Sequence, residues 1–345
     1  MHYSDCLKPF RLFKLKVPFY LFLIALFGII LIFSIYIRSL SSAALPVVSG
    51  LSNTMVQTYR SVRNSDFSYT KPILFIENNE ASDLDLLKQK ISSYIQGEQL
   101  KGTIRSASVI FRDLNNARWM TINKDELYSP GSLMKVPTMM TYLKQSETEP
   151  GLMDREIFFK QRFTAIPEQT ITGPKLVEGK NYKIKELLKY MIEYSDNDAT
   201  ALLNMNISFS TMQKLFSTLQ LPVPELRQPD YLIGVEDCSR FFITLYNGSY
   251  LNFKDSEFAL EMMTKSAYRN GLISGIDSTI PVAHKFGERN NNGEQQFHEF
   301  GIFYLNNHVY LLGVMTKGND HEKLPAIIGN VSKIVFNEIN AGKGT

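Results

Sequence analysis

The sequence predicts an α/β fold of the α+β kind: a three-layer α/β/α domain with a five-stranded antiparallel sheet and a helical subdomain, preceded by one N-terminal transmembrane helix. Three observations predict it. An uncharged run fills residues 17–37, close to the N-terminus. Two strand-like segments then precede a block of helical segments, and three more strands and a closing helix follow. Strands from both ends of such a chain can share one sheet between layers of helices.

The uncharged run is long enough to span a bilayer, which takes about 20 apolar residues in a helix. Basic residues gather before the run rather than after it: Lys8, Arg11, Lys14 and Lys16 precede it, and only Arg38 closely follows. The positive-inside rule therefore places residues 1–16 in the cytoplasm, makes 17–38 a membrane anchor, and puts the remainder outside the cell membrane. A signal peptide cleaved at the small residues 41–44 is the alternative, although its apolar core is usually only about 7–15 residues.

Beyond the anchor, residues 39–82 are polar and irregular and are interpreted as a stalk, whereas residues 83–345 form the exported domain. The hydrophobic content of 44% suffices for a packed core. A net charge of +3, with the basic residues dispersed among acids, does not indicate nucleic-acid binding. Cys6 and Cys238 fall on opposite sides of the predicted membrane, so no disulfide within the domain is expected. No metal site or other cofactor is expected either.

The expected elements of the domain follow from periodicity and turn signals. The first helix begins near Ser82 and carries Leu84, Leu87, Ile91 and Tyr94 on one face. Two strands at 104–112 and 117–122 are joined by a turn at Asn115-Asn116. Helices are expected at 132–145, 183–194, 197–204, 209–219, 236–247 and 255–264. Three strands near 279–286, 297–305 and 308–316 and a last helix at 322–340 complete the domain.

The first candidate for chemistry is Ser132-Leu133-Met134-Lys135, at the start of the helix at 132–145. A helix places residues three apart on one face, so the Ser132 hydroxyl and the Lys135 amine would be neighbours. Free N–H groups at the helix start favour an oxyanion there. Lys135 can act as a base only if burial or a second cation lowers its pKa. Such a pair also arises by chance, as at Ser68 and Lys71.

Two further motifs supply the remaining groups. Ser195-Asp196-Asn197 follows the helix at 183–194, where short polar residues often serve only as caps. Lys285-Phe286-Gly287 follows an apolar strand, and taken alone its lysine could be a solvated residue on a sheet edge. Gly287 permits a substrate to approach the strand closely. A nucleophile, two amines, a second hydroxyl and an amide together make a centre for acyl transfer.

In their order and context, the three motifs resemble the serine β-lactamase and penicillin-binding protein superfamily, and class A β-lactamases most closely. The resemblance covers residues from about Asp83 to Asn340. It implies that Ser132 is the nucleophile, Lys135 its base and Ser195 a proton relay to the leaving nitrogen. It also implies that Asn197, Phe286, Gly287 and Glu288 form the substrate site, that Lys285 attracts a substrate carboxylate, and that the N–H groups of Ser132 and Glu288 stabilise the oxyanion.

Two positions depart from the family pattern. If Pro224-Glu225-Leu226 aligns with the family's Pro-Glu-Leu, Val223 occupies the place of the glutamate that activates the deacylating water. Glu225, Asp230 or Glu236 could substitute for that glutamate. Phe286 replaces the usual Thr or Ser of the third motif. The lost hydrogen bond is expected to weaken binding of ordinary penicillins by about one to two decades, unless Arg289 compensates.

The resulting expectation is a membrane-anchored, outward-facing serine hydrolase. It would form an acyl-enzyme at Ser132 with a β-lactam or with a D-Ala-type amide of a peptidoglycan stem peptide. A slow-releasing penicillin-binding protein or D,D-peptidase is the first alternative, because Val223 cannot activate water. A non-catalytic wall-binding scaffold of the same fold is the second, since both Val223 and Phe286 depart from the pattern.

Overall fold

The structure is a computed structural model that describes Tyr69 and residues 80–116, 118–163, 171, 173–224, 231–291, 293–305 and 308–341. All of these residues lie in one compact unit, Tyr59–Thr345. The predicted cytoplasmic segment 1–16, anchor 17–38 and stalk 39–82 lie outside the described residues, except for Tyr69 and residues 80–82. No helix in the described part of the chain combines the length and apolar character needed to cross a membrane.

The centre of the domain is one five-stranded antiparallel sheet, as the sequence predicts, with the strand order β2-β1-β7-β6-β5. Its strands are β1 (Ser106–Asp113), β2 (Trp119–Ile122), β5 (Val282–Asn291), β6 (Glu294–Leu305) and β7 (His308–Gly318). The two N-terminal strands thus join the three C-terminal strands through the β1–β7 pair. In this order β5 lies at an edge of the sheet, and it is the strand that carries the third motif.

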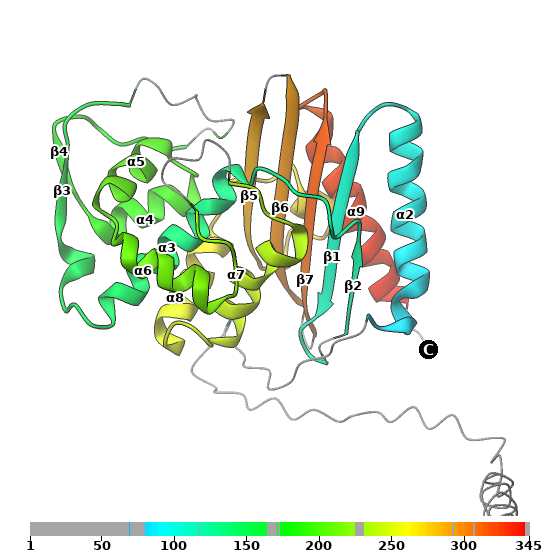
Figure 1. Cartoon of the computed structure of the whole chain (residues 1–345), viewed down its shortest axis with the longest axis horizontal. Helices are drawn as coiled ribbons and strands as arrows, with labels where there is room; N and C mark the ends of the chain where they lie inside the picture. The colour runs from blue at the N-terminus through cyan, green and yellow to red at the C-terminus, as the bar shows by residue number, and fades with distance from the viewer. Residues whose placement is uncertain are drawn as a thin grey trace, which may run out of the picture. The chain divides into compact units, whose positions relative to one another are not determined.

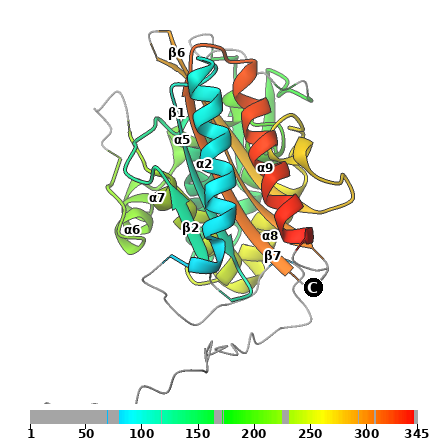
Figure 2. The ribbon, with the colours of Figure 1, turned by 90° about the vertical axis from the view of Figure 1, so that its right-hand side faces the viewer.

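Helices cover both faces of the sheet. The helices α2 (Asp85–Leu100) and α9 (Lys323–Ala341) lie side by side on one face (Figure 2), and the helical block covers the other (Figure 1). Alternate residues of β7 therefore enter different cores, with Leu311 and Met315 facing the helical block and Leu312 and Val314 facing α2 and α9. Burial on both faces explains why the strand reads as a nearly continuous apolar run.

The helical block has α3 at its centre. Its members are α3 (Lys135–Ser146), α4 (Ile184–Glu193), α5 (Asn197–Asn206), α6 (Phe209–Thr218), α7 (Val235–Asn247) and α8 (Phe253–Thr264). Every residue of α3 from Lys135 to Leu143 is buried, so this helix is enclosed on all sides by the others. The predicted helices agree with these bounds to within about two residues, which is the usual uncertainty of a helix end, except that the helix expected from Ser132 begins as α3 only at Lys135.

Three features differ from the sequence expectations. The strand expected near 279–286 is observed as β5, which begins at Val282 and continues to Asn291, so Lys285-Phe286-Gly287 lies within the strand and not after it. Strands β3 (Glu156–Phe159) and β4 (Lys180–Lys183) form a separate two-stranded sheet that was not predicted, because four residues are too few to establish a period. Ser82 lies in the short 3₁₀ helix η1 (Ser82–Leu84), and neither this helix nor α2 has a side-chain hydrogen bond at its N-cap. Residues 164–170 and 225–230, which include Glu225 and Asp230, lie outside the described residues.

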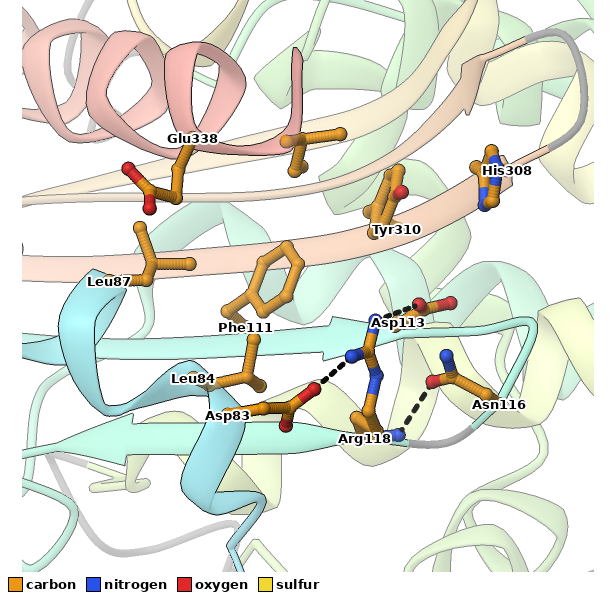
Figure 3. A pocket seen from close by; sticks show the side chains of 11 residues that line it. Asp83, Leu84, Leu87, Phe111, Asp113, Asn116, Arg118, His308, Tyr310 and Glu338 are labelled. Carbon is orange, nitrogen blue, oxygen red and sulfur yellow. Dashed lines mark hydrogen bonds and ion pairs between the residues drawn. The ribbon is translucent and has the colours of Figure 1, made fainter. Parts of the chain in front are cut away.

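A cavity of about 570 Å³ opens between the start of α2, the end of α9 and the β1–β2 hairpin. Figure 3 shows Arg118 at its floor, held between the carboxylates of Asp83 and Asp113. Phe111 and Tyr310 stack on one another in its wall, with ring centroids 5.6 Å apart. None of the site residues predicted from the sequence lines this cavity, so it is separate from the candidate active site.

Candidate active site

Ser132 and Lys135 occupy adjacent turns at the entrance to the central helix. Ser132 lies in the 3₁₀ turn η2 (Gly131–Met134) and is partly exposed, whereas Lys135 is the first residue of α3 and only 4% exposed. Ser132 is therefore within reach of solvent, while the Lys135 side chain lies in the protein interior. This division suits a nucleophile that meets substrate and a base that works from behind it.

Two glycines bring η2 against the edge strand β5. A Cβ added to Gly131 would lie 2.3 Å from the carbonyl oxygen of Glu288 and 3.0 Å from its nitrogen. A Cβ added to Gly287 would lie 2.1 Å from the Pro130 oxygen. Gly131 also has φ +53°, in the left-handed region that glycine adopts without strain. The first and third motifs are thus in backbone contact, and each side of that contact requires the absence of a side chain.

Lys135 reaches from α3 to the second motif. Its Nζ donates to Ser195 Oγ (2.9 Å), to Asn197 Oδ1 (2.8 Å) and to the backbone oxygen of Ser195. An ammonium has three donors, and these three acceptors use all of them. In the described part of the chain, no hydrogen bond joins Lys135 Nζ to the hydroxyl of Ser132.

Lys285 reaches the same hydroxyl from the sheet. Its Nζ donates to Ser195 Oγ (3.0 Å) and to the backbone oxygen of Phe286 (2.9 Å), and the residue is fully buried. Ser195 Oγ therefore lies between two lysine nitrogens that come from different layers of the domain. This convergence unites groups that are distant in the sequence.

Ser195 is held in place by an unusual backbone conformation. Its φ of 54° lies in the left-handed region, where a non-glycine residue is strained by about 1–3 kcal/mol. The next residue, Asp196, caps α5 by accepting a hydrogen bond from the N–H of Ala199 (2.7 Å). Asp196 thus serves as a cap, as short polar residues at a helix boundary often do. The cap fixes the turn, and the turn aims Ser195 at both lysines.

Burial makes both lysines weaker bases than lysine in water, and the charge of Lys135 adds to this effect at Lys285. Removal from solvent lowers the pKa of Lys135 to about 7, although the charges of Asp196 and Glu288 act in the opposite direction. Burial, followed by the charge of Lys135, lowers the pKa of Lys285 well below its ordinary value, against the charges of Glu299 and Glu288. A lysine with a pKa near 7 is partly neutral at physiological pH, as a general base must be.

Phe286 does not lie where the sequence interpretation placed it. Its ring is 1% exposed and stacks on Tyr268 (centroids 4.4 Å apart) and Phe297 (5.7 Å) in the core beneath α9. Phe286 was expected to form part of the substrate site, but residues alternate along a strand, and Phe286 faces the other layer. The ring centroid lies 4.0 Å from Lys285 Nζ, where it favours a cation.

The remaining predicted residues are placed as follows. Asn197 opens α5 with its amide oxygen on Lys135, and Glu288 contacts His321 Nε2 at 2.8 Å. Val223 is partly buried and packs on the core beside the helical block. Glu236 lies in the first turn of α7 and is partly exposed. Sequence reasoning missed Glu299 as a charge near Lys285, although a lone acid in the apolar run Phe297–Phe303 was a usable signal.

The layered arrangement of helices around an antiparallel sheet is that of a serine-hydrolase fold. The chain belongs to the Beta-lactamase enzyme family, whose family model matches residues 86–339. Its fold is shared with PBP-A at a TM-score of 0.64 and 16% identity, covering 78% of this chain and 100% of that one. A β-lactamase from Chitinophaga pinensis aligns at a TM-score of 0.62 and 18% identity, covering 73% and 99%.

A single-residue mutant of PBP-A, solved as an acyl-enzyme complex with penicillin G, has a TM-score of 0.63 and 19% identity. That alignment covers 75% of this chain and 97% of the mutant. No curated protein sequence matches this chain. The family match confirms the resemblance that the three motifs indicated, and the structural alignments confirm the fold.

Proposed function

We propose that this chain is a membrane-anchored serine acyl-hydrolase that acts outside the cell membrane on β-lactams or on D-Ala-type amides of the cell wall. The observation that carries the proposal is the placement of Ser195 Oγ between Lys135 Nζ and Lys285 Nζ, beside the turn that presents Ser132. Family membership and the penicillin complex of PBP-A support a β-lactam as ligand. The anchor at 17–38 and the outward orientation rest on the sequence alone.

Acylation follows from the donors and acceptors of the site. When Lys135 is neutral it keeps two N–H donors for its acceptors around Ser195 and gains a lone pair. That lone pair takes the proton of Ser132, whose oxygen attacks the amide carbonyl. The N–H groups of Ser132 and Glu288 stabilise the oxyanion. Ser195 then gives its proton to the leaving nitrogen, the C–N bond breaks, and Lys135 restores the proton to Ser195.

The base that would release the acyl group is not identified, whereas each group needed for acylation is named above. Release needs a base that activates water. If Pro224-Glu225-Leu226 aligns with the family's Pro-Glu-Leu, the glutamate's position is taken by Val223, an apolar side chain packed on the core. This observation favours the slow-releasing penicillin-binding protein or D,D-peptidase over a fast β-lactamase. Both share the acylation step, so they differ in the lifetime of the adduct.

The test is to mix the full-length chain, purified in detergent, with a labelled penicillin and to follow the adduct by mass spectrometry over time. A Ser132→Ala variant should form no adduct. Ser146→Ala, at the far end of the same helix, is the matched control and should label normally. Absence of an adduct at Ser132 in the wild type would refute the acylation proposal. Equal muropeptide binding by wild type and Ser132→Ala, without turnover by either, would favour the wall-binding scaffold instead.

A further inference from the structure

The segment that leads to the nucleophile is held on the sheet by two side chains of β6. Ser129 is buried, and its N–H donates to Gln296 Oε1 (2.9 Å), while its carbonyl oxygen accepts from His298 Nε2 (3.0 Å). Buried backbone groups have to be paired, and here the two side chains take the place of the backbone partners that a neighbouring strand would supply. The acylation steps above use neither Gln296 nor His298.

The partners of His298 fix its proton on Nε2. The N–H of Thr316 on β7 donates to Nδ1 (3.3 Å), so this nitrogen is the acceptor, and the carbonyl oxygen of Ser129 only accepts, so Nε2 is the donor. Burial lowers the pKa of His298 to about 3, so the ring is neutral at physiological pH and keeps both bonds. The Tyr128 ring meets it edge to face, with centroids 5.3 Å apart. The imidazole thus joins β7 to the segment before Ser132 in one orientation.

His298 lies beside the third motif, on the sheet face that meets the turn η2. In the register of β5 and β6 it is paired with Gly287, so both residues face the same side of the sheet. A Cβ on Gly287 would lie 2.1 Å from the Pro130 oxygen, on that same side. His298 therefore holds the chain one residue before its contact with β5 and three residues before Ser132.

We propose that His298 is a positioning residue for acylation, which holds the carbonyl of Ser129 and thereby fixes the backbone that presents the hydroxyl and the N–H of Ser132. Gln296 assists by holding the N–H of Ser129. The inference rests on the proposed function, because it assigns a residue that prepares that site. An oxyanion is stabilised only by donors that are already in place, and a displacement of about 1 Å can slow a reaction about 100-fold. His298 is 0% exposed and therefore acts through the backbone and not on the substrate.

Two variants separate the two hydrogen bonds of the ring. His298→Gln places an amide N–H near the position of Nε2 and can still donate to Ser129, whereas His298→Asn places an amide oxygen near the position of Nδ1 and can only accept from Thr316. At saturating penicillin, acylation of Ser132 in the full-length chain should slow about 100-fold in His298→Asn and less than about 5-fold in His298→Gln, with the affinity for penicillin unchanged in both. His308→Asn, on the same sheet but in the wall of the separate cavity, is the matched control and should label like wild type.

The position of the segment is also read without substrate, by hydrogen–deuterium exchange of the peptide that spans residues 128–133. Exchange should be faster than in wild type in His298→Asn and close to wild type in His298→Gln. Equal losses of acylation rate in the two variants, in proportion to equal losses of stability against denaturant, would show that His298 is merely structural and would overturn the inference. If His298→Asn does not fold, Gln296→Met, which removes the acceptor of the Ser129 N–H, decides by the same two measurements. A wild type that is never acylated would refute the proposed function, and the exchange rates alone would then decide whether His298 holds the segment.

Discussion

The pH dependence of acylation tests the assignment of Lys135 as the base. Because its lowered pKa is about 7, the neutral fraction of Lys135 increases as the pH rises through neutrality. That fraction is about 10% at pH 6 and about 90% at pH 8, so the acylation rate should increase roughly 10-fold over this interval. As the pH rises further, the rate should decrease again. The midpoint of this decrease should lie at a pH lower than 10.5, the ordinary pKa of lysine, because burial also lowers the pKa of Lys285.

A charge substitution should move the acidic limb of this profile in a known direction. Asp196→Asn keeps a residue that can cap α5 and removes a charge that raises the pKa of Lys135, so the limb should move to lower pH by about one unit. Asp198→Asn is the matched control. Its carboxylate accepts the N–H of Phe163 and has no part in the shift of Lys135, so the limb should stay in place.

The assay is rapid mixing of the full-length chain with a fluorescent penicillin between pH 5.5 and 9.5, with quenching and quantification of the adduct at Ser132. Rates are measured at limiting penicillin, so that the profile reports the free enzyme. A rate that is flat or decreasing from pH 6 to 8 would refute Lys135 as the base. An acidic limb that moves equally in Asp196→Asn and Asp198→Asn would refute the electrostatic explanation of its position.

Three substitutions test other parts of the site. Lys135→Met should abolish acylation but raise the free energy of unfolding at pH 6 by about 2 kcal/mol. Lowering the pKa of Lys135 to about 7 destabilises the wild type by about 5 kcal/mol, and the variant avoids this cost. The variant also loses three hydrogen bonds of about 1 kcal/mol each, which offsets part of the gain. Denaturant titrations should show this gain shrink between pH 7 and 10, where the unfolded chain binds the extra proton. Phe286→Thr should lower the free energy of unfolding by about 3 kcal/mol without faster penicillin labelling, because the ring fills the core; unchanged stability with faster labelling would contradict its placement. Gly287→Ala should slow acylation about 100-fold by separating β5 from η2, whereas Gly97→Ala, with nothing within 4 Å, should label like wild type.

Most elements of the layered fold could be predicted from local sequence patterns. The hairpin at Asn115-Asn116 and the apolar strands at 297–305 and 308–316 were predicted close to their observed bounds, because both faces of the sheet are buried and the turns are marked by polar residues. The helix at 132–145 was predicted as one element, although its first turn is the 3₁₀ segment η2. The β3–β4 pair was missed because its strands are short and half exposed.

The residues of the site could be predicted from the sequence, but the contacts between them could not. The types and order of Ser132, Lys135, Ser195 and Lys285 identify the chemistry, but only the fold shows that both amines meet at one hydroxyl. Alternation along β5 could have placed Phe286 opposite Lys285, yet the sequence does not say which face of an edge strand meets the substrate. The contact of His298 with Ser129 joins residues 169 positions apart, which no local pattern encodes.

The contact of Gly131 with Glu288 and of Gly287 with Pro130 makes the reaction centre a seam between two layers of the domain. One side of the seam brings the nucleophile and the base, and the other brings the second cation. A small separation of the layers would therefore silence the enzyme while leaving every helix and strand intact. On gradual heating, penicillin labelling should be lost at a lower temperature than the circular dichroism signal of the helices and strands. Activity would then report separation of the two layers before secondary structure is lost.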